Sequence, residues 1–247
     1  MTDFVLTIAN HNFAVSANFK STYDYFTEYV TSEKPEYSLA VTEDDIVFER
    51  KKAARADEME GIPYRRFSDA YLETIVVQRK VTEFLFDHDV LLFHGSVIAV
   101  DGEAYLFTAK SGTGKSTHTR LWREMFGDRA VMVNDDKPFL QFEGNKVYAH
   151  GSPWNGKHHL GENISVPLKA ICILERGVTN QIREIKPAEA LMMLMQQSSR
   201  PGNRNKMPKY MDMIDKLTQR VAFYRLQCNM DPEAAQIAWA AMGRKDD

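Results

Sequence analysis

Short blocks of hydrophobic residues recur along the chain, and one succession of them is central to the predicted fold. Residues 105–107 are apolar and typical of a strand, whereas Leu121, Trp122, Met125 and Phe126 recur at helical spacing. A polar turn with two glycines, residues 109–116, lies between the strand and the helix, and residues 130–133 form the next apolar strand. Strand, turn, helix and strand in this order predict an α/β domain, and an acidic pair, Asp135-Asp136, follows the second strand.

The remainder of this part of the chain continues the alternation of strands and helices. Residues 90–100 are apolar on both faces and predict one buried strand. Further strands are expected at residues 139–142, 146–149, 166–174, 181–185 and 222–226, with helices starting at Pro187 and Met207 and a closing helix after Asp231-Pro232. We therefore expect residues 90–247 to form one domain.

Residues 1–89 predict a separate, small α/β subdomain. The first 15 residues contain two short strands that suit a hairpin, and residues 68–88 carry the broad apolar face of a long helix. Two structures remain open for residues 42–49, a helix capped by Thr42 or a strand. None of these elements carries a recognisable chemical motif.

Composition and charge exclude several classes of function. The chain has 247 residues, of which 44% are hydrophobic and 26% charged, as is ordinary for a globular protein. Its net charge of -3 offers no basic excess for binding nucleic acid. No apolar run is long enough to span a membrane, and the N-terminus lacks the pattern of a signal peptide. Cys172 and Cys228 lie in apolar segments typical of thiols in a reducing compartment, so we expect a cytoplasmic protein.

The glycine-containing turn and the residues after it have the chemistry of a phosphate-binding loop. Gly112 and Gly114 lack a Cβ, so the backbone can bend tightly and bring its N–H groups close to phosphate oxygens. The helix that follows directs its positive N-terminal end at the same anion. Lys115 can reach the β- and γ-phosphates of ATP, and the Ser116 hydroxyl can bind Mg²⁺. The predicted nucleotide-binding residues are Ser111, Gly112, Thr113, Gly114, Lys115, Ser116 and Thr117.

One position departs from the usual phosphate-loop pattern, because Ala109 stands where that pattern begins with glycine. The simplest alternative is a surface turn of small polar residues. The predicted strand before the turn and the predicted helix after it favour the phosphate loop.

Two further polar segments supply candidate cations. The glycine-rich segment 150–163 contains Lys157, a candidate second phosphate contact. The basic segment 199–206 is either a solvated connection or a lid whose Arg200 or Arg204 neutralises phosphate charge.

His94-Gly95, the loop at residues 111–116 and Asp135-Asp136 follow one another in an order and at a spacing that resemble the HPr kinase/phosphorylase family of the PEP-carboxykinase-like P-loop superfamily. The resemblance covers about residues 90–175 and implies a kinase core with a mixed sheet. It also implies that the histidine lies beside a catalytic aspartate, which accepts the proton of a serine hydroxyl. The second aspartate and the loop hydroxyl would then serve Mg²⁺.

The segment after the acidic pair departs from that family. HPr kinases carry a glycine-rich, arginine-containing signature there, whereas this chain has GSPWNGKHHLGENISVPL at residues 151–168. The motifs NDDKP, PWNGK and YRLQCNMDPEAA look more like a bacterial subgroup related to HPr kinase, and some relatives of that subgroup phosphorylate a serine of peptide natural products. The resemblance therefore does not extend to HPr as the substrate.

Together these features predict an ATP-dependent kinase that acts on a hydroxyl group of a small molecule, a peptide or a protein. Asp135 would accept the hydroxyl proton, with His94 setting its charge and position, and Lys115 would hold the phosphates. Ser116 and Asp136 would bind Mg²⁺, although only the order of the two aspartates distinguishes their roles.

Two other hypotheses remain open. The first is a non-catalytic nucleotide-binding or sensor protein, which Ala109 favours. The second is a small PEP carboxykinase. Neither nucleic acid nor a membrane is an expected partner, and a homo-oligomer is compatible with each hypothesis.

Overall fold

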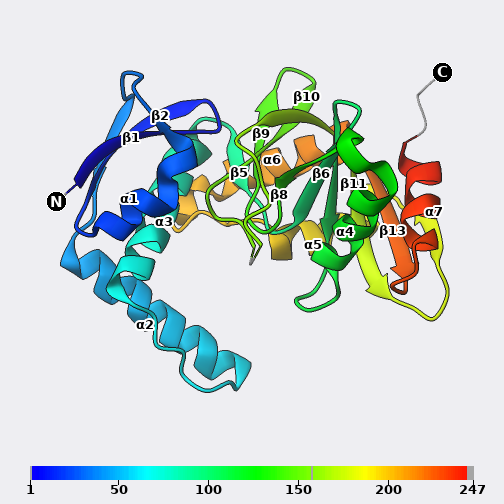
Figure 1. Ribbon diagram of the computed structural model, residues 1–247, viewed down its shortest axis with the longest axis horizontal. Coiled ribbons are helices and arrows are strands. Elements are labelled where there is room, and N and C mark those ends of the chain that lie inside the picture. Colours follow the sequence, from blue (N-terminus) through cyan, green and yellow to red (C-terminus); the bar gives the residue numbers. More distant parts are fainter. Residues whose placement is uncertain (1, 157, 244–247) are drawn as a thin grey trace. The chain divides into compact units, whose positions relative to one another are not determined.

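Strand pairing divides the chain into two units. The computed structural model describes residues 2–156 and 158–243. Residues Met1–Asp87 form one unit and His88–Asp247 the other, and each is described by itself (Figure 1).

The N-terminal unit is a small sheet with helices. Its strands are β1 (Thr2–Ile8), β2 (His11–Ala17), β3 (Val30–Thr31) and β4 (Tyr37–Ala40), in the order β3-β1-β2-β4. Its helices are α1 (Lys20–Phe26), α2 (Glu43–Glu60) and α3 (Asp69–Asp87), with a 3-10 turn at Thr27–Tyr29. The predicted hairpin is confirmed, and its turn lies at Ala9 and Asn10, which both take positive φ. Such a turn matches the twist of the two strands that it joins.

Local capping decides the structure of residues 42–49, which the hydrophobic pattern left open. The backbone N–H of Asp45 donates to the Thr42 side chain, and the Asp45 carboxylate accepts from the Thr42 N–H at 3.1 Å. This reciprocal capping box satisfies two N–H groups that would otherwise lack partners at a helix start. The segment is therefore a helix, α2, and it ends at Gly61 in the left-handed conformation with φ 66°.

A buried carboxylate holds the N-terminal unit together. Glu73, on α3, is fully buried and accepts hydrogen bonds from the N–H groups of Asn18 and Phe19, at 2.7 and 3.2 Å. The Thr22 hydroxyl and the Asn18 amide also donate to it. Because four donors satisfy this carboxylate, it fixes the start of α1 against α3.

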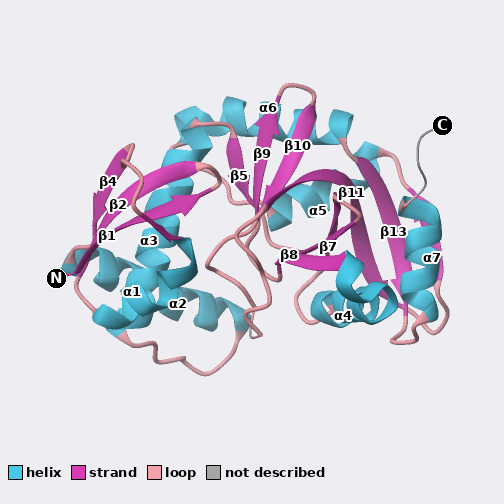
Figure 2. Cartoon of the chain, turned by 45° about the horizontal axis from the view of Figure 1, so that its top comes forward, coloured by secondary structure: helices cyan, strands magenta, loops and turns pink. Residues whose placement is uncertain are grey.

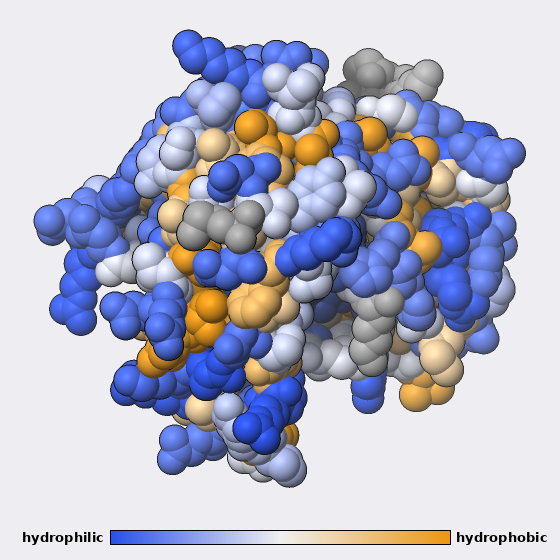
Figure 3. Space-filling view, turned by 60° about the vertical axis from the view of Figure 1, so that its left-hand side comes forward, coloured by the Kyte–Doolittle hydropathy of each residue, from blue (hydrophilic) through white to orange (hydrophobic). Residues whose placement is uncertain are grey.

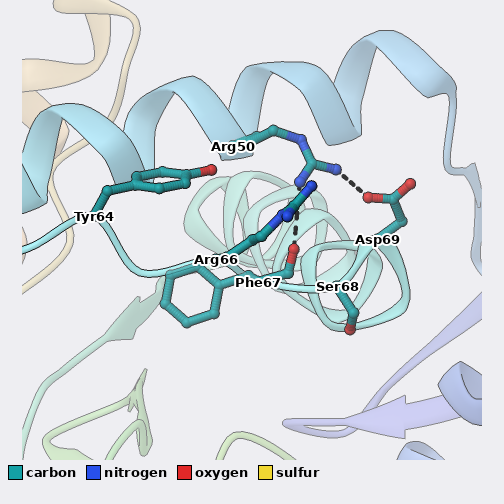
Figure 4. Close-up of a pocket in the computed structure, with 6 residues that line it drawn as sticks. All are labelled: Arg50, Tyr64, Arg66, Phe67, Ser68 and Asp69. Carbon is teal, nitrogen blue, oxygen red and sulfur yellow. Dashed lines mark hydrogen bonds and ion pairs between the residues drawn. The ribbon is translucent and has the colours of Figure 1, made fainter.

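The N-terminal unit also has an open cavity of about 910 Å³ beside α2. Arg50 forms an ion pair with Asp69, and its Nη1 donates to the Phe67 carbonyl at 3.3 Å (Figure 4). These contacts hold the segment between α2 and α3 against α2. We therefore interpret the cavity as a crevice between this segment and α2.

The C-terminal unit contains the larger sheet. Its strands are β5 (Val90–Leu92), β6 (Ser96–Val100), β7 (Glu103–Thr108), β8 (Ala130–Asn134), β9 (Phe139–Glu143), β10 (Lys146–His150), β11 (Ser165–Arg176), β12 (Gln181–Glu184) and β13 (Ala222–Cys228). Its helices are α4 (Lys115–Phe126), α5 (Pro187–Gln197), α6 (Met207–Arg220) and α7 (Glu233–Met242), with 3-10 turns at Gly127–Arg129 and Arg204–Lys206. The strand order is β5-β9-β10-β11-β7-β6-β8, and β13 pairs with β11 and β12.

This sheet is mixed, as predicted. Strand β11 runs parallel to both β7 and β13, whereas β6 runs antiparallel to β7 and β8. Helices α4 and α7 pack together over a core that contains Tyr105, Phe107 and Trp122 (Figure 2). The predicted α/β fold class is therefore confirmed.

The prediction of one strand over residues 90–100 is wrong. The chain forms β5, makes a single bridge to Ser198 at Phe93, interrupts the strand at residues 94–95, and then forms β6. At the break the His94 N–H donates to the Gln197 carbonyl at 2.7 Å, and the Gly95 N–H donates to the Asp136 carbonyl at 3.1 Å. A Cβ at Gly95 would lie 3.0 Å from the Phe107 carbonyl oxygen, so the residue leaves no room for a larger side chain. The break exposes the His94 side chain at the end of β6, which a continuous strand would not do.

The surface mixes hydrophobic and hydrophilic residues. On the face shown in Figure 3, hydrophobic residues form separate groups between hydrophilic ones. Within the described ranges, no helix combines the length and the apolar character that are needed to cross a membrane.

Candidate active site

The glycine turn, the acidic pair and His94 meet at one edge of the larger sheet. Strands β7 and β8 both pair antiparallel with β6, so they run in the same direction and their carboxyl ends lie at the same edge. The N-terminal end of β6 lies there too, because Ser96 is opposite Phe107 and Val97 is opposite Asn134. Strand β11, parallel to β7, also ends at this edge. The glycine turn, the acidic pair and His94 are thereby brought together.

The turn after β7 has the backbone conformation of a tight loop. Gly112 and Gly114 take positive φ, 74° and 117°, a region that favours glycine. The Thr113 N–H and hydroxyl both donate to the Lys110 carbonyl, at 3.2 and 2.8 Å. Gly114 then caps the N-terminus of α4. This arrangement directs a helix N-terminus at the loop, as an anion site requires.

Ala109 fits its position in the loop. Its side chain is fully buried in the core formed with Phe107 and Trp122, and it is not among the residues with positive φ. A glycine is therefore not required by the backbone there, and the departure from the usual pattern leaves the loop intact.

Lys115 is the first residue of α4 and is half-buried. Burial lowers the pKa of its ammonium group below the ordinary value, although the negative charges of Asp136 and Asp135 act in the opposite direction. Two carboxylates thus lie close enough to Lys115 to influence its charge.

The two aspartates have different partners. His94 Nε2 lies 3.3 Å from Asp136 Oδ1, whereas the Ser96 hydroxyl donates to Asp135 Oδ1 at 2.7 Å. Burial opposes the ionisation of Asp136, but the hydrogen bond from His94 and the nearby lysine charges prevail and hold its pKa below the ordinary value. The sequence predicted that His94 acts on Asp135. In the structure His94 lies beside Asp136 instead, and Asp135 accepts a hydrogen bond from Ser96.

Asn134 shapes the backbone that carries both aspartates. Its side-chain oxygen accepts from the N–H groups of Asp136 and Lys137, at 2.8 and 2.6 Å. Its amide nitrogen donates to the Ser152 carbonyl and hydroxyl, at 3.0 and 3.1 Å. Asn134 is fully buried, so these contacts orient the acidic pair from the interior of the protein.

A cavity of about 420 Å³ opens beside this edge. Ser116 and Asp135 line it, together with Thr117, Thr119, Arg120, Arg123, His158 and Leu160. Asp135 is only 6% exposed, and its Oδ2 faces Gly156, where a Cβ would lie 2.9 Å away. Glycine at this position therefore leaves space next to the carboxylate.

The other candidates differ in exposure and in contacts. Ser111 and Ser116 are exposed, and Thr113 and Thr117 are half-buried. Lys157 lies outside the described residues. Arg204 is exposed in the 3-10 turn before α6, and no hydrogen bond or ion pair joins it to the loop within residues 2–156 and 158–243.

The start of the segment that contains Arg200 and Arg204 is fixed near the site. The Ser199 N–H donates to the Leu92 carbonyl at 2.9 Å, and Ser198 forms a β-bridge with Phe93. Arg200 follows directly and is exposed. This segment therefore begins next to His94.

Sequence reasoning missed Arg176, a residue that contacts the phosphate loop. At the carboxyl end of β11, its Nη2 donates to the Gly112 carbonyl at 2.6 Å. Ser96 and Asn134 were missed for a similar reason, since single serine and asparagine residues carry no motif. Only the position of Arg176 at the end of a strand could have indicated its role.

We expect Arg176→Ala to weaken Mg-ATP binding by about tenfold, because the loop loses a hydrogen bond from a charged group. Calorimetric titration with Mg-ATP would measure the change. Arg183→Ala is the matched control, since Arg183 is an exposed arginine whose guanidinium is paired with Glu189 instead. Equal losses in both variants would contradict a role for Arg176 in the loop.

A buried histidine lies behind the loop on α4. His118 is 2% exposed, its ring is 4.5 Å from that of Phe107, and its Nε2 accepts from Trp122 Nε1 at 3.1 Å. Burial lowers the pKa of His118 to about 4, from 6.5. The neutral ring is therefore part of the folded core.

We expect this histidine to make the protein less stable in acid. In the unfolded chain His118 binds a proton below about pH 6.5, whereas in the folded chain it does so only below about pH 4. The free energy of unfolding therefore falls by about 3 kcal/mol as the pH drops through this range. Urea unfolding at pH 7 and pH 4 would measure it in the native protein and in His118→Gln, which keeps an acceptor for Trp122. An identical pH dependence in the two proteins would refute the assignment.

Comparison with known proteins identifies the family. Residues 68–237 match the model of the family described as SynChlorMet cassette protein ScmC, and the matched range includes the loop, His94 and both aspartates. The chain belongs to this family. No curated protein matches the sequence.

Among solved structures, the chain is similar to the Hpr(Ser) kinase/phosphatase from Coxiella burnetii. The sequence identity is 10%, the TM-score is 0.35, and the match covers 62% of this chain and 99% of the other. A likeness this distant assigns no role to any residue of this chain.

Proposed function

We propose that this protein is a kinase that transfers the γ-phosphate of ATP to a hydroxyl group. One observation carries the proposal: Ser116 of the phosphate loop and the buried carboxylate of Asp135 line the same cavity. A site for phosphate and a proton acceptor next to it are the parts that phosphoryl transfer to an alcohol requires.

In this proposal the loop holds the nucleotide. The backbone N–H groups of residues 111–117 and the ammonium group of Lys115 bind the β- and γ-phosphates. Lys157 and Arg204 are proposed as additional cations, and Arg200 is the alternative to Arg204 in the same segment.

Ser116 and Asp136 are the proposed ligands of Mg²⁺. Both offer oxygen, which Mg²⁺ prefers, and the lowered pKa of Asp136 keeps its carboxylate ionised. Bound Mg²⁺ neutralises charge on the phosphates. His94 then acts as a hydrogen-bond partner that orients the Asp136 carboxylate.

Asp135 is the proposed proton acceptor. The hydroxyl oxygen of the acceptor forms a bond to the γ-phosphorus while the bond from that phosphorus to the bridging oxygen breaks, and the electron pair leaves with ADP. The hydroxyl proton moves to Asp135, and Ser96 holds the other carboxylate oxygen in place. Glycine at position 156 leaves room beside Asp135 Oδ2, since a Cβ there would lie 2.9 Å from this oxygen.

The family description names neither reaction nor acceptor, so the test begins with the nucleotide. Calorimetry with Mg-ATP measures binding, and an ADP-release assay over a panel of alcohols, serine peptides and oxaloacetate measures transfer. If the protein binds Mg-ATP but no compound raises ADP release above the rate with water alone, a nucleotide-binding sensor is favoured. Formation of phosphoenolpyruvate from oxaloacetate would favour a PEP carboxykinase. Absence of Mg-ATP binding would refute the proposal.

A further inference from the structure

The cavity beside Asp135 continues along one face of α4. Ser116, Thr119, Arg120 and Arg123 line it, and their spacing of three and four residues places them on the same side of the helix. The α-carbons of Ser116 and Arg123 are about 10 Å apart along the helix axis, from a rise of roughly 1.5 Å per residue. The cavity therefore has a phosphate-loop end at Ser116 and a second end at Arg123.

The second end is cationic. Arg120 Nη1 lies 2.5 Å from Glu124 Oε1, so its charge is largely matched. The Arg123 guanidinium forms no ion pair and no hydrogen bond within the described part of the chain, and the contact with the Gly127 N–H is made by the Arg123 backbone carbonyl. An arginine in a cavity without an acidic partner is available to bind an anion.

This cation is poorly placed to serve the transferred phosphate. Lys115 and the loop N–H groups already lie at the other end, and Arg123 is about two helical turns beyond Lys115. Asp135 and Arg123 line the same cavity. A molecule whose hydroxyl lies at Asp135 would extend its remaining atoms towards Arg123.

Resting on the proposed kinase function, we propose that the phosphate acceptor carries a carboxylate several bonds from its hydroxyl, and that Arg123 binds this carboxylate. A free hydroxy acid and a serine flanked by acidic residues share this chemistry. Arg123 is then a specificity-determining residue: it selects anionic over neutral acceptors and leaves the affinity for ATP unchanged.

The test measures binding to the full chain saturated with magnesium and a non-hydrolysable ATP analogue, so that no turnover is needed. Two pairs of probes replace each carboxylate by its amide: D-glycerate against D-glyceramide, and the N-acetylated, C-amidated peptide Glu-Gly-Ser-Gly-Glu against the equally capped Gln-Gly-Ser-Gly-Gln. We expect at least one carboxylate probe to bind about tenfold more tightly than its neutral partner, as loss of a charge-assisted contact would imply. The pair that shows the preference identifies the source of the carboxylate.

Arg123→Ala should remove this preference, and Arg123→Lys should restore part of it. The matched control is Arg220→Ala, since Arg220 is likewise an arginine in the last turn of a helix. Equal binding of charged and neutral probes to the native protein would overturn the inference, as would a preference that persists in Arg123→Ala. So would failure of every carboxylate to bind at millimolar concentration.

Nucleotide binding is measured first, which separates this inference from the proposed function. If the native protein does not bind Mg-ATP, the kinase proposal itself fails. If the native protein binds Mg-ATP and Arg123→Ala loses that affinity, Arg123 belongs to the nucleotide site and only the acceptor inference fails.

Discussion

Lys115→Ala should reduce the affinity for Mg-ATP by about 100-fold or more. Lys115 is the first residue of α4, at the point where the loop backbone and the helix N-terminus converge. Its removal eliminates a charge-assisted hydrogen bond, worth about 1.5–3 kcal/mol, and the attraction of its charge for two phosphates. Each 1.4 kcal/mol corresponds to about tenfold in affinity, so the two effects together account for the expected loss.

Calorimetric titration of the native and variant proteins with Mg-ATP checks this result. Lys110→Ala is the matched control, because Lys110 lies in the same loop with an exposed side chain and contributes its carbonyl to the turn. We expect the control to change the affinity little. Unchanged affinity in Lys115→Ala would show that the loop does not bind nucleoside triphosphate in the proposed way.

The local parts of this site could be predicted from the sequence because each depends on neighbouring residues. Glycines at 112 and 114 indicate positive φ, and both have it. Hydrophobic spacing indicates α4, and the run of apolar residues before Asn134 indicates β8. Whether the site binds ATP and Mg²⁺ stays a prediction.

The long-range contacts could not be predicted, because their partners are distant in the sequence. Adjacent aspartates point in different directions from the same backbone, so order alone could not show that His94 meets Asp136 and Ser96 meets Asp135. Arg176 reaches Gly112 only because β11 lies parallel to β7.

The break between β5 and β6 could not be predicted for the same reason. An apolar run is compatible with one continuous strand, and the break depends on hydrogen bonds to the carbonyls of Gln197 and Asp136. By contrast, Thr42 and Asp45 are three residues apart, so the capping box that selects the α2 helix was visible in the sequence.

The acidic pair allows one substitution to separate binding from transfer. Asp135→Asn should retain the affinity for Mg-ATP within a few-fold, since asparagine has nearly the same shape and its oxygen can still accept the hydrogen bond from Ser96. Asp135 is not paired with His94, so its loss of charge leaves the His94–Asp136 contact in place. Asp136→Asn is the informative counterpart, because it should weaken the dependence of nucleotide binding on Mg²⁺.

Transfer, in contrast, should fall by about 1,000-fold in Asp135→Asn, because an amide cannot accept the hydroxyl proton and general-base catalysis contributes roughly 10²–10⁴-fold. Single-turnover release of ADP from bound Mg-ATP, with water as the simplest hydroxyl acceptor, measures this without knowledge of the natural acceptor. Asp135→Glu is the complementary variant, since it keeps a carboxylate but moves it by one methylene, and it should retain more activity than Asp135→Asn. If Asp135→Asn releases ADP at the native rate, Asp135 is not the base, and Asp136, held by His94, becomes the carboxylate to test next.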